Sequence, residues 1–226
     1  GFVGADTVAC LTAASFGEQT EAVLLLDIGT NGELALTDGR RRVCCSTAAG
    51  PAFEGANISC GMRARPGAID HAWLEGGALR LSSIDDAPII GVCGSGLVEL
   101  AALLAQEGII DESGRLRPVG GLSARIVGSG AQTAFLLTEH GADGAPLYLT
   151  QRDVRELQLG KAALRAGTEL LCQALSLTPE RIARVLIAGA FGSRLAPDAL
   201  CNIGLLPASM RDRVESIGNA AGEGAK

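Results

Sequence analysis

Three apolar runs near the start of the chain are separated by short polar turns. The runs cover residues 22–27, 33–37 and 42–46. The first turn contains Asn31-Gly32 and the second contains Asp38-Gly39. Both pairs are typical of β-hairpin turns, because they accept the positive φ angles that such turns need. The pattern therefore predicts a three-stranded antiparallel meander.

A short amphipathic helix is expected before the meander, over residues 5–16, with Asp6 or Thr7 near its start. Ahead of it, residues 1–4 resemble the tail of a preceding strand. A domain seldom begins inside such an element. We therefore expect the chain to be a fragment, or a processed C-terminal part, of a longer polypeptide.

The remainder of the chain predicts a mixture of strands and helices. A long helix is expected over residues 152–175, with Thr150 and Asp153 as candidate caps. Shorter helices are predicted after residue 96 and from residue 196 onward. The predicted strands are a hairpin over residues 67–84 and single strands at 124–127, 134–138, 146–149 and 184–188. Such a mixture indicates an α/β fold.

Glycine-rich junctions follow three of the apolar strands. They cover residues 27–33, 93–96 and 189–192. Glycines there let bare backbone N–H groups approach a phosphate, and Asp27 at a strand end can position a metal-bound water. If the three strands share one open sheet, the junctions surround a nucleotide in one crevice. A plain hairpin at the first junction and close helix-to-sheet packing at the second explain the same residues equally well.

Composition narrows the class of protein. With 226 residues, of which 47% are hydrophobic, the chain can bury a large core as one sizeable domain or two small ones. A formal charge of −6 without a basic block argues against a nucleic-acid partner. The absence of an apolar run long enough to cross a bilayer argues against a membrane protein. We expect a soluble, cytoplasmic protein.

The seven cysteines include no C-x-x-C pair. Their spacing fits neither a disulfide framework nor a zinc or iron–sulfur site, and no metal ligand is assigned in this chain. Buried free thiols in a reducing cytoplasm are the expectation. A cluster shared between two chains through one cysteine each stays open.

An ordered set of motifs extends over some two hundred residues of the chain. It comprises residues 1–8, 27–33, 46–56, 61–64, 93–97, 151–158, 188–192 and 203–207. In this set the chain resembles the C-terminal ATPase portion of the reductive activators of corrinoid proteins. That portion belongs to the superfamily of actin, sugar kinases and heat-shock ATPases. The resemblance implies a ribonuclease H-like α/β fold, an actin-like ATPase half with a mixed sheet and flanking helices. Residues 1–226 would form this single half, with a loop and hairpin insertion at about residues 47–90.

The resemblance implies a function as well. The chain would take part in the ATP-dependent reductive activation of a corrinoid protein, in which Co(II) is reduced to Co(I), with ATP and Mg²⁺ as cofactors. Asp27 would be catalytic. The nucleotide-binding residues would be Gly29, Thr30, Asn31, Gly32, Gly94, Ser95, Gly96, Gly189, Ala190, Phe191 and Gly192.

The expected partner is a corrinoid protein of a methyltransferase system, and a homodimer stays open. Phe53 and Glu54 are assigned to the face that meets this partner, because their loop has no counterpart in a minimal ATPase half. An ordinary salt-bridged surface role explains Glu54 as well. The sequence does not indicate which corrinoid protein or methyl donor is involved.

Two parts of the resembling family have no counterpart in this sequence. The first ATPase half and the iron–sulfur module are both missing, so the chain alone would supply one side of the ATP site and no electron carrier. Two other functions therefore stay open, a small-molecule kinase of the same superfamily and a non-catalytic docking module.

Overall fold

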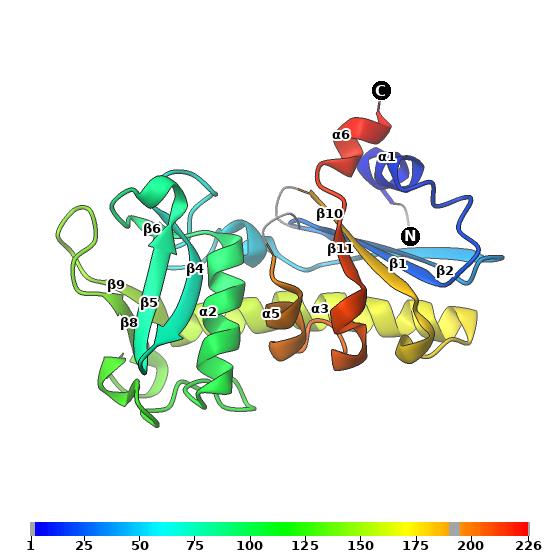
Figure 1. The fold of residues 1–226 in the computed structure, drawn as a ribbon. Coiled ribbons are helices and arrows are strands. Elements are labelled where there is room, and N and C mark those ends of the chain that lie inside the picture. The colour runs from blue at the N-terminus through cyan, green and yellow to red at the C-terminus, as the bar shows by residue number, and fades with distance from the viewer. Residues whose placement is uncertain (1–2, 190–194, 226) are drawn as a thin grey trace. The chain divides into compact units, whose positions relative to one another are not determined.

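A computed structural model describes residues 3–189 and 195–225 (Figure 1). Contacts divide the chain into two compact units. The first consists of Gly1–Gly50 and Gly160–Lys226, and the second is Pro51–Leu159. The second unit contains most of the segment predicted as an insertion and continues well past residue 90.

The first unit is built on a five-stranded mixed sheet. Its strands are β1 (Val23–Ile28), β2 (Gly32–Thr37), β3 (Arg42–Thr47), β10 (Arg184–Ala188) and β11 (Val214–Ser216). The strands lie in the order β11-β10-β1-β2-β3. Neighbouring strands among β1, β2 and β3 are antiparallel, whereas β10 runs parallel to β1 and β11 runs parallel to β10. This arrangement confirms the predicted meander and the predicted mixed sheet.

β1 lies at the centre of this sheet and is buried on both faces. Leu24, Leu25 and Leu26 are all fully buried, as expected for a strand covered by helices on each side. Helices α1 (Ala5–Ala13) and α6 (Ala220–Gly224) lie over one face (Figure 1). α1 confirms the short helix predicted at residues 5–16.

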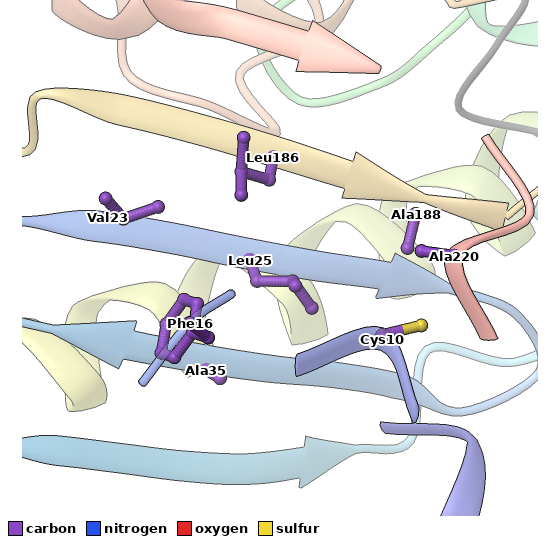
Figure 2. Close-up of a cluster of buried hydrophobic side chains, with 8 residues drawn as sticks. All are labelled: Cys10, Phe16, Val23, Leu25, Ala35, Leu186, Ala188 and Ala220. Carbon is purple, nitrogen blue, oxygen red and sulfur yellow. The ribbon is translucent and has the colours of Figure 1, made fainter. Parts of the chain in front are cut away.

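The face beneath α1 and α6 carries an apolar cluster, shown in Figure 2. Its members are Cys10, Phe16, Val23, Leu25, Ala35, Leu186, Ala188 and Ala220. Because side chains alternate along a strand, Val23 and Leu25 point into this cluster and Leu24 points to the opposite face. Burial of each large aliphatic side chain contributes about 1.5–3 kcal/mol to folding.

The opposite face of the sheet packs on the second half of α3 (Gln151–Leu175). A Cβ atom at Gly167 of α3 would lie 2.7 Å from Thr47 Cγ2 of β3, so the helix backbone packs directly on side chains of the sheet. The helix begins as predicted, because Thr150 N donates to Asp153 Oδ2 (2.8 Å) and Asp153 N donates to Thr150 Oγ1 (3.2 Å). This reciprocal pair is a capping box. After β10, α5 (Pro197–Asn202) confirms the last predicted helix.

The second unit contains two small sheets. One has the order β5-β4-β6 and the other the order β7-β8-β9. The strands are β4 (Ala68–Glu75), β5 (Ala78–Ser83), β6 (Gly91–Val92), β7 (Ile126–Val127), β8 (Ala134–Thr138) and β9 (Leu147–Thr150). α2 (Gly94–Gln106) packs against β4. The hairpin and the three single strands predicted in this region are confirmed.

One topological prediction is wrong. The strand that precedes residues 93–96 is β6, which belongs to a sheet of the second unit and not to the five-stranded sheet. Only two residues long, β6 pairs with β4, and nothing in its local sequence specifies that partner. Within the described residues, no helix is long and apolar enough to span a membrane.

Candidate functional site

The turn between β1 and β2 forms part of a pocket of about 320 Å³ in the first unit. The pocket is lined by Gly4, Asp6, Thr7, Asp27, Gly29, Thr30, Asn31 and Glu33. Four of these are predicted site residues, Asp27 as a catalytic residue and Gly29, Thr30 and Asn31 as nucleotide-binding residues. The structure thus places them together around one cavity that several oxygen-bearing side chains line.

The backbone of this turn is held from two sides. Gly29 N donates to Asn31 O at 3.2 Å, which closes the turn on itself. Gly50 N donates to Thr30 O at 2.9 Å, which ties the end of the meander to the same turn. The loop is therefore fixed before any ligand arrives, as a site that recognises phosphate through backbone groups requires.

Sequence reasoning missed the contribution of α1 to this pocket. Asp6 and Thr7 were interpreted only as residues near a helix start. The N-cap of α1 is Gly4, and no side chain caps the helix, so these two side chains are available to line the cavity. The signal that could have found them is the motif of residues 1–8 in the family resemblance.

Gly32 has a packing role that the turn alone does not indicate. It is the first residue of β2, and a Cβ atom there would overlap the side chain of Leu164 and lie 2.8 Å from Thr47 Oγ1. A larger residue at this position would therefore displace the side chains of Leu164 and Thr47. Gly32 is not among the residues that line the pocket, and its nucleotide-binding role stays a prediction.

The pocket is acidic. It is lined by the carboxylates of Asp6, Asp27 and Glu33 and by no lysine or arginine from the described part of the chain. Burial raises the pKa of Asp27, and the charge of Asp6 raises it further. Burial and the neighbouring Asp27 also raise the pKa of Glu33. Because these charges repel one another and would repel a phosphate, the pocket favours a ligand that brings a cation.

Cys10 lies behind Asp27. Its Sγ atom donates to Asp27 Oδ2 at 3.7 Å. Burial, followed by the charge of Asp27, raises the pKa of the Cys10 thiol to about 12. The thiol is therefore protonated at neutral pH, and it serves as a weak donor to the carboxylate rather than as a metal ligand or nucleophile.

The donor set fits a hydrated Mg²⁺ ion. Within residues 3–189 and 195–225, no three metal-ligating side chains come close enough to form an all-protein cage. Mg²⁺ does not need one, since it keeps several waters and uses one or two carboxylates together with substrate phosphates. Asp27 and Glu33 are the carboxylates at the turn, and they would hold such an ion directly or through its waters.

The junction predicted at residues 189–192 begins beside the one at residues 27–33. β10 lies beside β1 with Ala188 opposite Asp27, and a Cβ atom at the following Gly189 would lie 3.4 Å from Asp27 Oδ1. Gly189 has a φ of 90°, which favours glycine. Ala190, Phe191 and Gly192, which the sequence assigns to the same junction, lie outside the described residues.

The junction predicted at residues 93–96 begins α2 in the second unit. A Cβ atom at Gly96 would overlap the carbonyl oxygen of Ile69 on β4, so close packing of α2 on β4 accounts for this glycine. Gly94 and Ser95 are buried in the same first turn of the helix. Cys93 Sγ lies 3.3 Å from Ser95 Oγ and donates to Ile69 O at 3.2 Å. A role of this junction in nucleotide binding stays a prediction.

The partner-facing assignment of Phe53 needs correction. Phe53 lies in the 3-10 helix η1 (Pro51–Glu54) and is 1% exposed. The ring is buried because η1 packs near α2, so it belongs to the core rather than to a docking surface. Glu54 is exposed, and its partner-facing role stays a prediction.

The expectation of buried thiols is also only partly met. All seven cysteines are free, and Cys10, Cys93, Cys172 and Cys201 are buried. Cys44 is exposed on β3, because this edge strand alternates exposed and half-buried positions.

Comparison with known proteins identifies the class to which this fold belongs. The chain belongs to the family described as the C-terminal domain of RACo, the ASKHA domain, which matches residues 21–226. It is 38% identical, over 234 residues, to the corrinoid activation enzyme RamQ of Eubacterium limosum, covering 100% of this chain and 39% of that protein. It is 29% identical, over 241 residues, to the Co(II) methylated amine-specific corrinoid protein reductase of Methanosarcina barkeri. The match covers 97% of this chain and 41% of that protein.

A solved structure agrees with this assignment. The reductive activator for corrinoid, iron-sulfur protein superposes with a TM-score of 0.90 at 34% sequence identity, over 99% of this chain and 36% of that one. The chain thus spans about two fifths of the length of the curated relatives it matches. The family and the fold class predicted from the motifs are confirmed.

Proposed function

We propose that this chain forms one wall of the Mg²⁺–ATP site of a protein that reductively activates a corrinoid protein. The observation that carries the proposal is the pocket of Asp27, Gly29, Thr30 and Asn31 at the end of β1. It occurs in a chain whose relatives are named corrinoid activation enzyme and corrinoid protein reductase.

The residues of the turn would act on the phosphates. Backbone N–H groups of the turn other than that of Gly29, which donates to Asn31 O, would face phosphate oxygens, and the hydroxyl of Thr30 and the amide of Asn31 would add side-chain donors. Asp27 would accept hydrogen bonds from the waters of Mg²⁺ and orient one of them. The cation carried by the nucleotide would offset the repulsion among Asp6, Asp27 and Glu33.

The rest of the ATP site would come from residues outside this chain. The family resemblance implies a first ATPase half, and the chain covers only 36% of the solved reductive activator. We infer that residues 1–226 are the C-terminal half of the ATPase, with a large insertion between β3 and the middle of α3. Free thiols throughout suit a reducing cytoplasm.

In the proposed reaction, water attacks the terminal phosphoryl group of ATP to give ADP and phosphate. The free energy released drives a separate electron transfer, in which Co(II) of the partner gains one electron and becomes Co(I). The electron would come from a low-potential one-electron donor outside this chain, such as an iron–sulfur cluster. The partner would be the corrinoid protein of a methyltransferase system.

The test follows cobalt by its absorption spectrum. A Co(II) corrinoid protein is incubated with titanium(III) citrate and the full-length protein, with ATP, with ADP, or with a non-hydrolysable ATP analogue. We expect Co(I) to accumulate only with ATP, and ADP to be released without any added phosphoryl acceptor. Reduction that is independent of the nucleotide would contradict the proposal. ADP release that requires a small-molecule acceptor would identify a kinase instead.

A further inference from the structure

A second pocket, in the second unit, has three exposed arginines among the residues that line it. It has a volume of about 420 Å³ and is lined by Arg115, Arg117 and Arg155, with Thr133, Gln151 and Gly130 among the other lining residues. None of the residues that line it is acidic. Three guanidinium groups around one cavity are notable in a chain whose formal charge is −6.

Arg115 and Arg117 lie on the same side of an extended segment of the chain. Ile110 and Leu116 form an antiparallel bridge, and Arg117 N donates to Ile109 O at 2.7 Å. In such an extended segment, side chains two residues apart point the same way. Arg115 and Arg117 therefore share one side, while Leu116 between them is buried.

The third arginine is oriented by neutral groups. Arg155, in the first turns of α3, donates from Nη1 to Ser113 O (2.7 Å) and to Gln158 Oε1 (2.7 Å). These bonds fix the guanidinium without neutralising its charge. The Arg115 guanidinium has no ion-pair partner within residues 3–189 and 195–225. Arg117 has only a loose one, with Nη1 3.9 Å from Asp111 Oδ2.

The wall of the pocket is built before a ligand enters. Gln151 uses both ends of its amide on the backbone, accepting from Leu116 N (2.8 Å) and donating to Gly114 O (2.7 Å). Gln151 N donates to Thr133 O at 2.8 Å, which joins the start of α3 to β8. A Cβ atom at Gly130 would meet nothing within 4 Å, so the cavity stays open on that side.

We propose that this pocket binds a phosphorylated small molecule, at a site separate from the ATP pocket. The three arginines and Asp111 leave two uncompensated positive charges, which match a phosphate monoester. Arginine forks suit its oxygens. A phosphate group alone would fill only part of the 420 Å³, and the remaining space would take a polar body beside Gly130 and Thr133.

Calorimetric titration with inorganic phosphate, at constant ionic strength, tests the charged end of this site. We expect saturable binding to the full-length protein and a Kd at least about tenfold higher in the Arg115→Gln/Arg155→Gln variant, because charge-assisted hydrogen bonds are lost. The matched control is Arg63→Gln/Arg65→Gln, which removes the same charge at two exposed positions of the same unit and should leave the Kd unchanged.

Asp27→Asn is the second control, because the ATP pocket also attracts phosphate when a cation is present. Phosphate binding should survive this substitution. If the double variant does not fold, Arg115→Gln alone repeats the test, since no ion pair within the described residues holds that side chain. The proposal is overturned by the absence of saturable binding, by equal loss in the Arg63/Arg65 control, or by loss in Asp27→Asn.

Discussion

At the scale of single residues, Asp27 shows a conflict between stability and its proposed function. It is held in an acidic pocket, partly desolvated, beside Asp6 and Glu33. Such a carboxylate destabilises the folded protein at neutral pH, and it persists at functional sites because the ligand relieves the conflict. Cys10 compensates only weakly, through a single thiol contact of 3.7 Å.

We predict that Asp27→Asn raises the thermal stability of the ligand-free protein at pH 7. Since the pKa of Asp27 is raised on folding, the folded state binds the proton more tightly than the unfolded state. The contribution of Asp27 to stability is then largest below the ordinary carboxyl pKa of about 3.9 and falls as the pH rises through the raised pKa. The difference in thermal stability between Asp27→Asn and the wild type should therefore disappear toward pH 4.

Calorimetric melting temperatures between pH 4 and pH 8 measure this effect. Glu18→Gln, which removes one negative charge at an exposed position, serves as the control and should change little at any pH. A melting temperature that falls at pH 7 in Asp27→Asn would show that the charged form of Asp27 stabilises the fold, contrary to our account.

The same scale shows what sequence could and could not predict about the site. That Gly29, Thr30 and Asn31 lie together could be predicted, because a strand, a turn and a return strand are local in sequence. Asp6 was missed as a lining residue because only the tertiary packing of α1 brings it there. Phe53 was misassigned because burial of a ring in a glycine-rich loop depends on what packs over it.

At the scale of elements, the start of α3 holds separate segments of the second unit together through hydrogen bonds. Asp153 is fully buried. Its carboxylate accepts from Thr150 N (2.8 Å), from Ser59 N (2.8 Å) and from Ser59 Oγ (3.0 Å). One side chain thus caps the helix and anchors the loop that precedes β4.

We predict that Asp153→Ala destabilises the protein by about 2–4 kcal/mol, since loss of a cap costs about 1 kcal/mol and buried donors left without a partner cost about 1–3 more. Urea denaturation monitored by circular dichroism measures the change. Glu156→Ala, three residues further along the same helix, is the control. A loss below about 0.5 kcal/mol, the range of ordinary surface substitutions, would contradict the assignment of Asp153 as an anchor.

Elements with a clear periodic pattern of apolar residues were predictable. Elements defined by pairing with a strand distant in the sequence were not. The meander follows from alternating apolar runs and two turn pairs, and the capping box of α3 follows from Thr150 and Asp153 three residues apart. β6 has two residues, and its sheet is set by its pairing with Ala68 and Ile69 of β4. A segment that short carries no period, so its sheet could not be predicted.

At the scale of the whole molecule, the five-stranded sheet explains why the pocket lies where it does. β1 and β10 run parallel and end side by side, which brings Gly189 to Asp27. The turn between β1 and β2 leaves the sheet at the same end. The second unit carries an arginine-lined pocket of its own, so we assign the two pockets to different ligands.

The central claim is that the pocket at the end of β1 binds the phosphates of a magnesium nucleotide. Its most direct test is a calorimetric titration of the full-length protein with ATP, with and without Mg²⁺, repeated with Asp27→Asn. We predict saturable binding of Mg²⁺–ATP that weakens by about tenfold or more when either Mg²⁺ or the Asp27 carboxylate is removed. Equal affinity in all three cases would contradict the account.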